Sequence, residues 1–358
     1  MFPHYRLAVI KEMQKSKLIK YTFIGDQKQQ EGIKPIHENE FESFIEAKYY
    51  EFNGIYVQPK SVKIALTGDF DAIIYLGNPN FLTSWVACAI TKLRKKKLCF
   101  WTHGWLKKEG SLKSLIRNLY YKNADIIFTY NNRSAAQAKQ FGFSGTRNIH
   151  PIYNSLDLSK SNEIYDIISN EKQVPSIPIF SCVARITKTC RFDQLIKASK
   201  ILTEKGIENK IELIGAGPEL KKIKELAAEL NVNLVAHGEC YDEDTIGKLI
   251  YRSTATVCPG KIGLSAIHSL SYGTPVITHD NLDRQMPEHE AIIEGRTGNL
   301  FKENDIHSLA EAMETWISKA SQKTQTREYC RSEINQRWNP KTQAQLIENH
   351  ILNLPRND

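Results

Sequence analysis

Long apolar segments are missing from this chain of 358 residues. The longest candidate, residues 81–90, contains Thr83 and Ser84, whereas a membrane-spanning helix needs about 20 apolar residues. We therefore expect no transmembrane helix. The first ten residues have neither a basic leader nor a long apolar core, so we expect no secretory signal and no export.

Paired cysteines and metal-binding motifs are also missing. The seven cysteines are dispersed and odd in number, without Cys-x-x-Cys and without a histidine at ligand spacing, which indicates reduced thiols in a cytoplasmic protein. Asp-x-Asp spacings occur at Asp69 and Asp71 and at Asp242 and Asp244. Neither pair follows an expected strand, so we interpret both as solvated acidic residues and expect no metal.

Complete nucleotide-cofactor fingerprints do not occur either. Residues 213–220 (LIGAGPEL) follow an expected strand and open a helix, as a dinucleotide loop does. However, Leu220 stands where the third glycine belongs and Pro218 stiffens the turn. The chain also lacks a Gly-Lys-Ser/Thr phosphate loop, a Gly-x-Ser-x-Gly elbow and a His-Glu-x-x-His motif. We expect no cofactor.

Acidic residues are scarce in the N-terminal part. Residues 1–160 contain 24 Lys and Arg against 13 Asp and Glu (+11), and the remaining 198 contain 24 against 27 (−3), which gives the total of +8. From Lys92 to Lys122 only Glu109 opposes ten basic residues. A solvated face and an anionic partner surface both explain such a run. The partner that we expect is an anionic membrane surface, not a nucleic acid.

Residues 111–122 predict an amphipathic basic helix. Apolar residues recur at i, i+3, i+4, i+7 and i+8, namely Leu112, Leu115, Ile116, Leu119 and Tyr120. We expect this stripe to pack on its own domain, with insertion into a lipid interface as the alternative.

Short apolar runs, each followed by a loop and a helical stretch, recur along the chain. They cover residues 71–77, 97–102, 124–130, 179–184, 210–214, 255–258 and 275–278. Continuous apolar strands joined by helices predict buried parallel sheets, and hence two doubly wound, Rossmann-like α/β domains. The polar residues 157–178 are interpreted as the linker.

Two loops in the C-terminal part suit a diphosphate. A strand ends at Cys258, a helix begins near Leu264, and Lys261 lies between them, as in helix N-termini that bind phosphate. Arg185, Lys188 and Arg191 follow the strand at 179–184, at the end where parallel sheets bind ligands. Packing of the glycine-rich turn and solvation of the charged loop are the alternatives.

These segments and others resemble retaining family 4 glycosyltransferases. The resemblance rests on Arg185 with its basic loop, 215–218 (GAGP), His237-Gly238, Gly263-Leu264, 272–276 (YGTPV), 290–298, 101–104 (WTHG), Ala124-Asp125 and 153–157 (YNSLD). It implies the glycosyltransferase-B fold, in which two Rossmann-like domains face a cleft. The implied domains are 1–158 for the acceptor, joined by a crossover helix in 338–358, and 159–337 for the nucleotide sugar.

The resemblance also implies site residues. Those near the reaction are His103, Arg185, Lys188 and Arg191; those at the donor are Gly215, Gly217, Gly260, Lys261, Gly263, Leu264 and His268; those on the acceptor side are His4, Tyr5, Arg6, Trp101 and Trp105.

The chain departs from the family pattern at three positions. Gly260 and His268 replace two family glutamates, and Cys190 replaces a lysine. We therefore expect His268 to bond the ribose, and Lys188 or Arg191 to supply the second cation. The usual first strand is expected to be short or missing.

The function implied is metal-independent transfer of a hexose with retention. The donor is a UDP-sugar rather than a GDP-sugar, and the acceptor is a glycan or lipid-linked glycan in surface polysaccharide synthesis. Such an enzyme would be cytoplasmic and peripheral to the inner face of the membrane. The alternatives are a glycan- or nucleotide-sugar-binding protein that has lost transfer, and a nucleotide-sugar epimerase.

Overall fold

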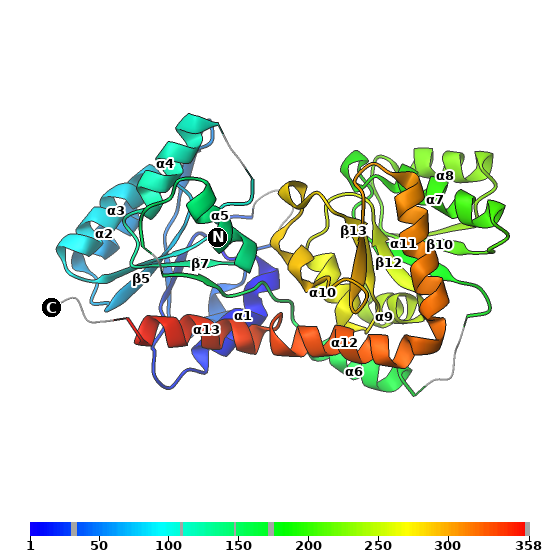
Figure 1. Cartoon of the computed structure of the whole chain (residues 1–358). Helices are drawn as coiled ribbons and strands as arrows, with labels where there is room; N and C mark the ends of the chain where they lie inside the picture. The colour runs from blue at the N-terminus through cyan, green and yellow to red at the C-terminus, as the bar shows by residue number, and fades with distance from the viewer. Residues whose placement is uncertain (30–33, 108–109, 147, 171–174, 355–358) are drawn as a thin grey trace. The chain divides into compact units, whose positions relative to one another are not determined.

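The chain forms two compact units (Figure 1). In a computed structural model, residues 1–29, 34–107, 110–146, 148–170 and 175–354 are described. The first unit comprises Met1–Asp157 and Asn339–Asp358, and the second comprises Leu158–Trp338.

A parallel sheet forms the centre of the first unit, with the strand order β5-β6-β7-β8. Its strands are β5 (Ala72–Leu76), β6 (Lys97–Trp101), β7 (Ile126–Thr129) and β8 (Ile149–Pro151). The connecting helices are α3 (Leu82–Leu93), α4 (Ser111–Tyr121) and α5 (Asn132–Gln140). All three helices contribute to one buried cluster on the sheet, with Cys88 from α3, Tyr120 from α4 and Ala138 from α5. Helix α2 (Pro59–Thr67) packs beside α3.

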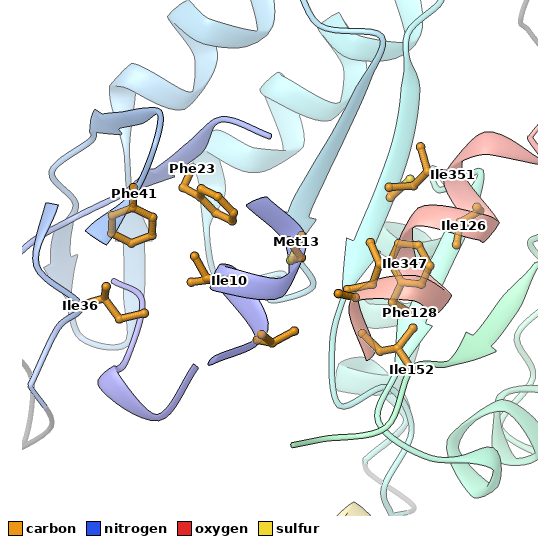
Figure 2. Close-up of a cluster of buried hydrophobic side chains, with 13 residues drawn as sticks. Ile10, Met13, Phe23, Ile36, Phe41, Ile126, Phe128, Ile152, Ile347 and Ile351 are labelled. Atoms are coloured by element: carbon orange, nitrogen blue, oxygen red, sulfur yellow. The ribbon is translucent and has the colours of Figure 1, made fainter. Parts of the chain in front are cut away.

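A second buried cluster contains residues from the two ends of the chain. Helix α1 (Leu7–Gln14) contributes Ile10 and Met13, and helix α13 (Pro340–Leu352) contributes Ile347 and Ile351, which pack with Phe128 of β7 (Figure 2). The last helix therefore belongs to the first unit. Two smaller sheets complete this unit: the parallel pair β1 (Phe23–Gly25) and β2 (Phe44–Glu46), and the hairpin β3 (Tyr50–Phe52) and β4 (Ile55–Val57).

The second unit is built on a six-stranded parallel sheet with the order β11-β10-β9-β12-β13-β14. Its strands are β9 (Ile179–Val183), β10 (Lys210–Ile214), β11 (Leu234–Gly238), β12 (Ala255–Cys258), β13 (Val276–His279) and β14 (Gly298–Phe301). Its helices include α7 (Phe192–Glu204), α8 (Leu220–Glu229), α9 (Glu243–Arg252), α10 (Leu264–Ser271), α11 (Ile306–Ser318) and α12 (Lys323–Gln336). The strand order reverses between β9 and β12, and such a switch point is where open parallel sheets bind ligands.

The segment predicted to be a linker contains a helix. Helix α6 (Ser159–Ile168) buries Ile164 and Ile168 against α9, in a cluster that includes Ile250 and Tyr272. These two isoleucines are four residues apart and so lie on one helical face, but surrounding Ser and Asn residues hide the pattern. The prediction of a linker is therefore wrong for 159–168, which pack in the second unit; residues 171–174 lie outside the described parts.

The prediction of two α/β units with parallel sheets is confirmed by the strand orders. No helix in the described parts of the chain is both long and apolar enough to cross a membrane.

Candidate functional site

Three loops meet at the carboxyl edge of the second sheet, after β9, β10 and β12. The β9 and β10 loops are joined by a hydrogen bond from the N–H of Ile186 to the carbonyl of Ala216, 2.9 Å long. A Cβ atom at Gly215 would lie 2.0 Å from the carbonyl oxygen of Ala184, and one at Gly217 would lie 2.2 Å from that of Ile186. Glycine is therefore required at both positions to bring the loops together.

Gly260 joins the β12 loop to the β9 loop in the same way. It is buried, and a Cβ atom there would lie 1.9 Å from the carbonyl oxygen of Thr189. Thr189 belongs to the short 3₁₀ helix Lys188–Cys190, which precedes α7. The structure thus gives Gly260 a packing role, and its predicted place at the donor stays a prediction. No side chain at this position could reach a ligand without moving the backbone.

The N-terminus of α10 follows this contact. Gly263 is its N-cap residue and makes no side-chain capping hydrogen bond. The N–H groups of a first helical turn have no intrahelical acceptor, and the helix dipole is positive there. The predicted pair Gly263 and Leu264 therefore lies at an end of a helix that favours an anion.

A buried glutamine, which the sequence analysis missed, holds this loop from the β13 side. The side chain of Gln285 accepts from the N–H of Ile262 at 2.8 Å and donates to the hydroxyl of Thr278 at 2.9 Å. The N–H of Met286 also donates to the carbonyl of Ile262 at 3.1 Å. No sequence motif marks such a clamp, because its partners are distant in the chain.

Three predicted cations surround these loops. Arg185, Lys188 and Lys261 are exposed, and none of them forms an ion pair with another residue in the described parts of the chain. Arg191 differs, because its Nη1 donates to Asn304 at 2.7 Å and its Nε lies 3.4 Å from a carboxylate oxygen of Asp193. Of the two residues proposed to supply the second cation, Arg191 thus already has partners for its guanidinium, whereas Lys188 has no ion-pair partner among the described residues.

His268 is held by Glu243, a carboxylate that the sequence analysis did not single out. Its Nε2 lies 2.7 Å from Oε1 of Glu243, and the hydroxyl of the buried Tyr272 donates to the same oxygen at 2.6 Å. Burial raises the pKa of Glu243, but the hydrogen bonds from His268 and Tyr272 outweigh it and leave the pKa below its ordinary value. Asp242 and Asp244 on either side of Glu243 are exposed, as predicted.

This pairing sets the chemistry of the imidazole. An ionised carboxylate can only accept a hydrogen bond, so Nε2 of His268 carries the proton. In the neutral ring Nδ1 is then an acceptor, as a carboxylate oxygen would be.

Three of the predicted residues in the first unit lie together at the carboxyl ends of β6 and β7. The guanidinium carbon of Arg6 lies 4.9 Å from the centroid of the Trp101 ring, and Arg6 donates to the hydroxyl of Tyr130. The ring of the exposed His103 lies 4.8 Å from that of Tyr130, centroid to centroid. Tyr130 was missed, but it directly follows β7 and so stands at the same sheet edge.

The other three residues predicted on the acceptor side lie in two different places. His4 and Tyr5 belong to the 3₁₀ helix His4–Arg6, with their rings 5.7 Å apart, and so lie next to Arg6. Trp105 is completely buried, packs against Phe143, and donates from Nε1 to Asn118 at 2.9 Å. It is a core residue, and the prediction that it contacts an acceptor is wrong.

Comparison with known proteins fits this arrangement. Residues 166–334 match the family described as glycosyl transferases group 1. No curated protein sequence matches the chain closely enough to count as a relative.

Similar solved structures extend over both units. The lipopolysaccharide outer core galactosyltransferase WaaB, in its apo form, is 15% identical, with 97% of this chain and 94% of that chain covered and a TM-score of 0.70. A glycosyltransferase from Rickettsia africae is 15% identical, covering 97% and 95% with a TM-score of 0.69. HepE from Anabaena, in complex with UDP and glucose, is 16% identical, covering 98% and 96% with a TM-score of 0.66.

The identities are low, so the structures establish the fold alone. The chain has the glycosyltransferase-B fold, and residues 166–334 of its second unit match the glycosyl transferases group 1 family.

Proposed function

We propose that the protein is a retaining glycosyltransferase that moves a sugar from a nucleotide diphosphate sugar to a hydroxyl of an acceptor glycan. One observation carries the proposal. At the switch point of the second sheet, the uncapped N-terminus of α10 adjoins a loop with the unpaired cations Arg185 and Lys188, and Lys261 lies between β12 and α10.

This arrangement suits the difficult step of the reaction. The bond between the anomeric carbon and the diphosphate oxygen breaks, and its electron pair leaves with the diphosphate. The acceptor oxygen forms the new bond on the same face of the sugar, and its proton passes to the departing diphosphate oxygen. Hydrogen bonds to charged groups contribute about 1.5–3 kcal/mol each, and a helix terminus about 0.3–2 kcal/mol. Stabilisation of the leaving diphosphate is thus the main catalytic contribution, and the proposal includes no metal.

The ligands and activities with which similar structures are described support a proposal for the donor and the acceptor. HepE is described with UDP and with UDP-glucose, and TarM from S. aureus with UDP and α-GlcNAc-glycerol. WaaB is described as a galactosyltransferase of the lipopolysaccharide outer core. We therefore propose a UDP-hexose rather than a GDP-sugar as donor. The proposed acceptor is a glycan or lipid-linked glycan of a surface polysaccharide, at the cytoplasmic face of the membrane.

In this proposal the residues of the first unit serve the acceptor and the reacting centre. The exposed imidazole of His103 can donate or accept a hydrogen bond there. Arg6 and the ring of Trp101 offer a cation and an aromatic face to a sugar.

The test is release of nucleoside diphosphate from a panel of nucleotide sugars, with and without glycan acceptors and in excess chelator. We expect UDP only when an acceptor is present. His103→Ala should lower transfer about tenfold or more without changing UDP affinity, because a lost hydrogen bond at the reacting centre costs about 1–1.5 kcal/mol or more. His37→Ala, an exposed histidine of the same unit, is the matched control.

Other outcomes would reject the proposal. Conversion of one nucleotide sugar into another without UDP release would indicate an epimerase. Nucleotide-sugar binding without any turnover would indicate a binding protein.

A further inference from the structure

Helix α4 turns its apolar stripe to solvent. The exposed fractions are 68% for Leu112, 55% for Leu115, 41% for Ile116 and 52% for Leu119, whereas Tyr120 and Tyr121 are buried. The helix thus contacts its sheet through its tyrosines, and the expectation that the aliphatic stripe packs on its own domain is wrong.

Helix α3 shows the same arrangement. Leu82, Val86 and Leu93 are 52%, 53% and 84% exposed. Their spacing of four and seven residues places them on one helical face. The buried residues of α3 lie on the opposite face: Ser84, Ala87, Cys88 and Thr91.

The two stripes belong to one surface. The ring of Trp85 in α3 lies 4.8 Å from that of Tyr120 in α4, centroid to centroid, and the hydroxyl of Tyr120 donates to Ser84 at 2.6 Å. Both helices bury their inner faces in the same cluster on the sheet, side by side in Figure 1. We call the exposed residues the α3–α4 surface: Leu82, Val86, Leu93, Leu112, Leu115, Ile116 and Leu119.

This surface is strongly basic. Lys95, Lys107, Lys113 and Lys122 are exposed and form no ion pair with another described residue. From Leu82 to Lys122 the sequence contains a single acidic residue, Glu109. An uncompensated positive field of this kind attracts an anionic partner and repels a second copy of itself.

We propose that the α3–α4 surface lies on an anionic lipid bilayer. Leu, Ile and Val would enter the acyl boundary while the lysines reach the headgroups, the composition typical of interfacial helices. Protein interfaces are instead enriched in aromatic residues and depleted in lysine. The exposed stripes contain no aromatic residue. This inference does not depend on the proposed transferase activity.

The first test is co-sedimentation of the full chain with vesicles of phosphatidylcholine, with and without about one third phosphatidylglycerol. We expect binding to the anionic vesicles alone. It should be lost at about 1 M salt, where the Debye length is about 3 Å. Binding that ignores lipid charge, or no binding at all, overturns the proposal.

Variants test whether vesicle binding depends on residues of the α3–α4 surface. Leu115→Ser combined with Leu119→Ser should weaken binding about tenfold or more, because two aliphatic side chains would no longer enter the bilayer. Lys113→Glu should weaken it about fivefold or more, since each basic residue near the surface contributes about 1 kcal/mol. The controls are Ile167→Ser on α6, whose side chain is 62% exposed, and Lys224→Glu on α8.

The thermal midpoint of every variant checks that the fold is intact. If the surface variants bind vesicles as the controls do, the proposal fails. It also fails if wild-type protein self-associates in solution and Leu115→Ser with Leu119→Ser abolishes that association, because the surface is then an interface between copies of the chain.

Discussion

At the scale of single residues, the proposed donor site combines a glycine and a histidine where the family pattern has two carboxylates. Gly260 is needed for loop packing, so no side chain at this position can take the place of the family's glutamate. In the neutral tautomer that places the proton on Nε2, facing Glu243, Nδ1 of His268 is an acceptor. In the proposed donor site, the pair Glu243 and His268 would thus offer a ribose hydroxyl an acceptor, as a single carboxylate does.

His268→Ala should raise the KM for the donor about five- to tenfold while kcat stays within about twofold. The reason is that one hydrogen bond to the ribose, worth about 1–1.5 kcal/mol, is lost without touching the leaving group. Tyr272→Phe is the control, because it removes the other bond to Glu243 and keeps the imidazole. A large fall in kcat for His268→Ala would instead place the imidazole at the reacting centre.

The positions of the candidate residues along the chain were easier to predict from the sequence than the neighbours of each residue in the fold. His103, Arg6 and Trp101 could be found because each follows from a sheet edge or a family motif. The burial of Trp105 and the partner of His268 could not, because both depend on residues brought from elsewhere in the chain: Phe143 for Trp105, and Glu243 for His268.

At the scale of elements, the alternation of strands and helices was predictable, but the direction in which a helix faces was not. Apolar periodicity located α4, yet the buried side of that helix is formed by Tyr120 and Tyr121. Periodicity reveals a stripe, and only the neighbouring sheet determines whether that stripe is covered. Helix α6 was missed for the opposite reason, because its two buried isoleucines are surrounded by polar residues.

The contact between the β9 and β12 loops leads to a stability prediction. Gly260→Ala should lower the thermal midpoint and weaken UDP binding, because overpacking against the Thr189 carbonyl costs about 1–3 kcal/mol. Scanning calorimetry of the thermal midpoint and titration calorimetry of UDP affinity check this prediction. Gly263→Ala is the control for stability, since its nearest contact would be an ordinary 3.5 Å to Met286. A Gly260→Ala protein with wild-type midpoint and affinity would show that the loops do not need this close approach.

At the scale of the whole molecule, the last helix completes the first unit. Helix α13 packs on α1 and β7, and the ring of its His350 stacks on that of His150 in β8, with centroids 3.7 Å apart. Burial, together with His350, lowers the pKa of His150 from 6.5 to about 4. Both rings are therefore neutral in the folded protein near pH 7.

Acid should lower the free energy of unfolding of the unit that α13 completes. Unfolded chains bind protons at histidine as the pH falls through about 6.5, while folded His150 remains neutral until about pH 4. The free energy of unfolding should thus fall across this window and be independent of this group below it. Thermal midpoints from about pH 7 to about pH 4 test this. His150→Phe should flatten the dependence, and His307→Gln, an exposed control on α11, should leave it unchanged.

The central claim is that the diphosphate of a nucleotide sugar binds beside the β9 loop and the N-terminus of α10. Calorimetric titration of UDP and of uridine into the wild type, Arg185→Ala and the exposed control Arg296→Ala tests it most directly. Arg185→Ala should weaken UDP binding about ten- to a hundredfold, because a charge-assisted bond worth about 1.5–3 kcal/mol is lost, and should leave uridine binding unchanged. Equal losses for UDP and uridine, or no loss for UDP, would contradict the account.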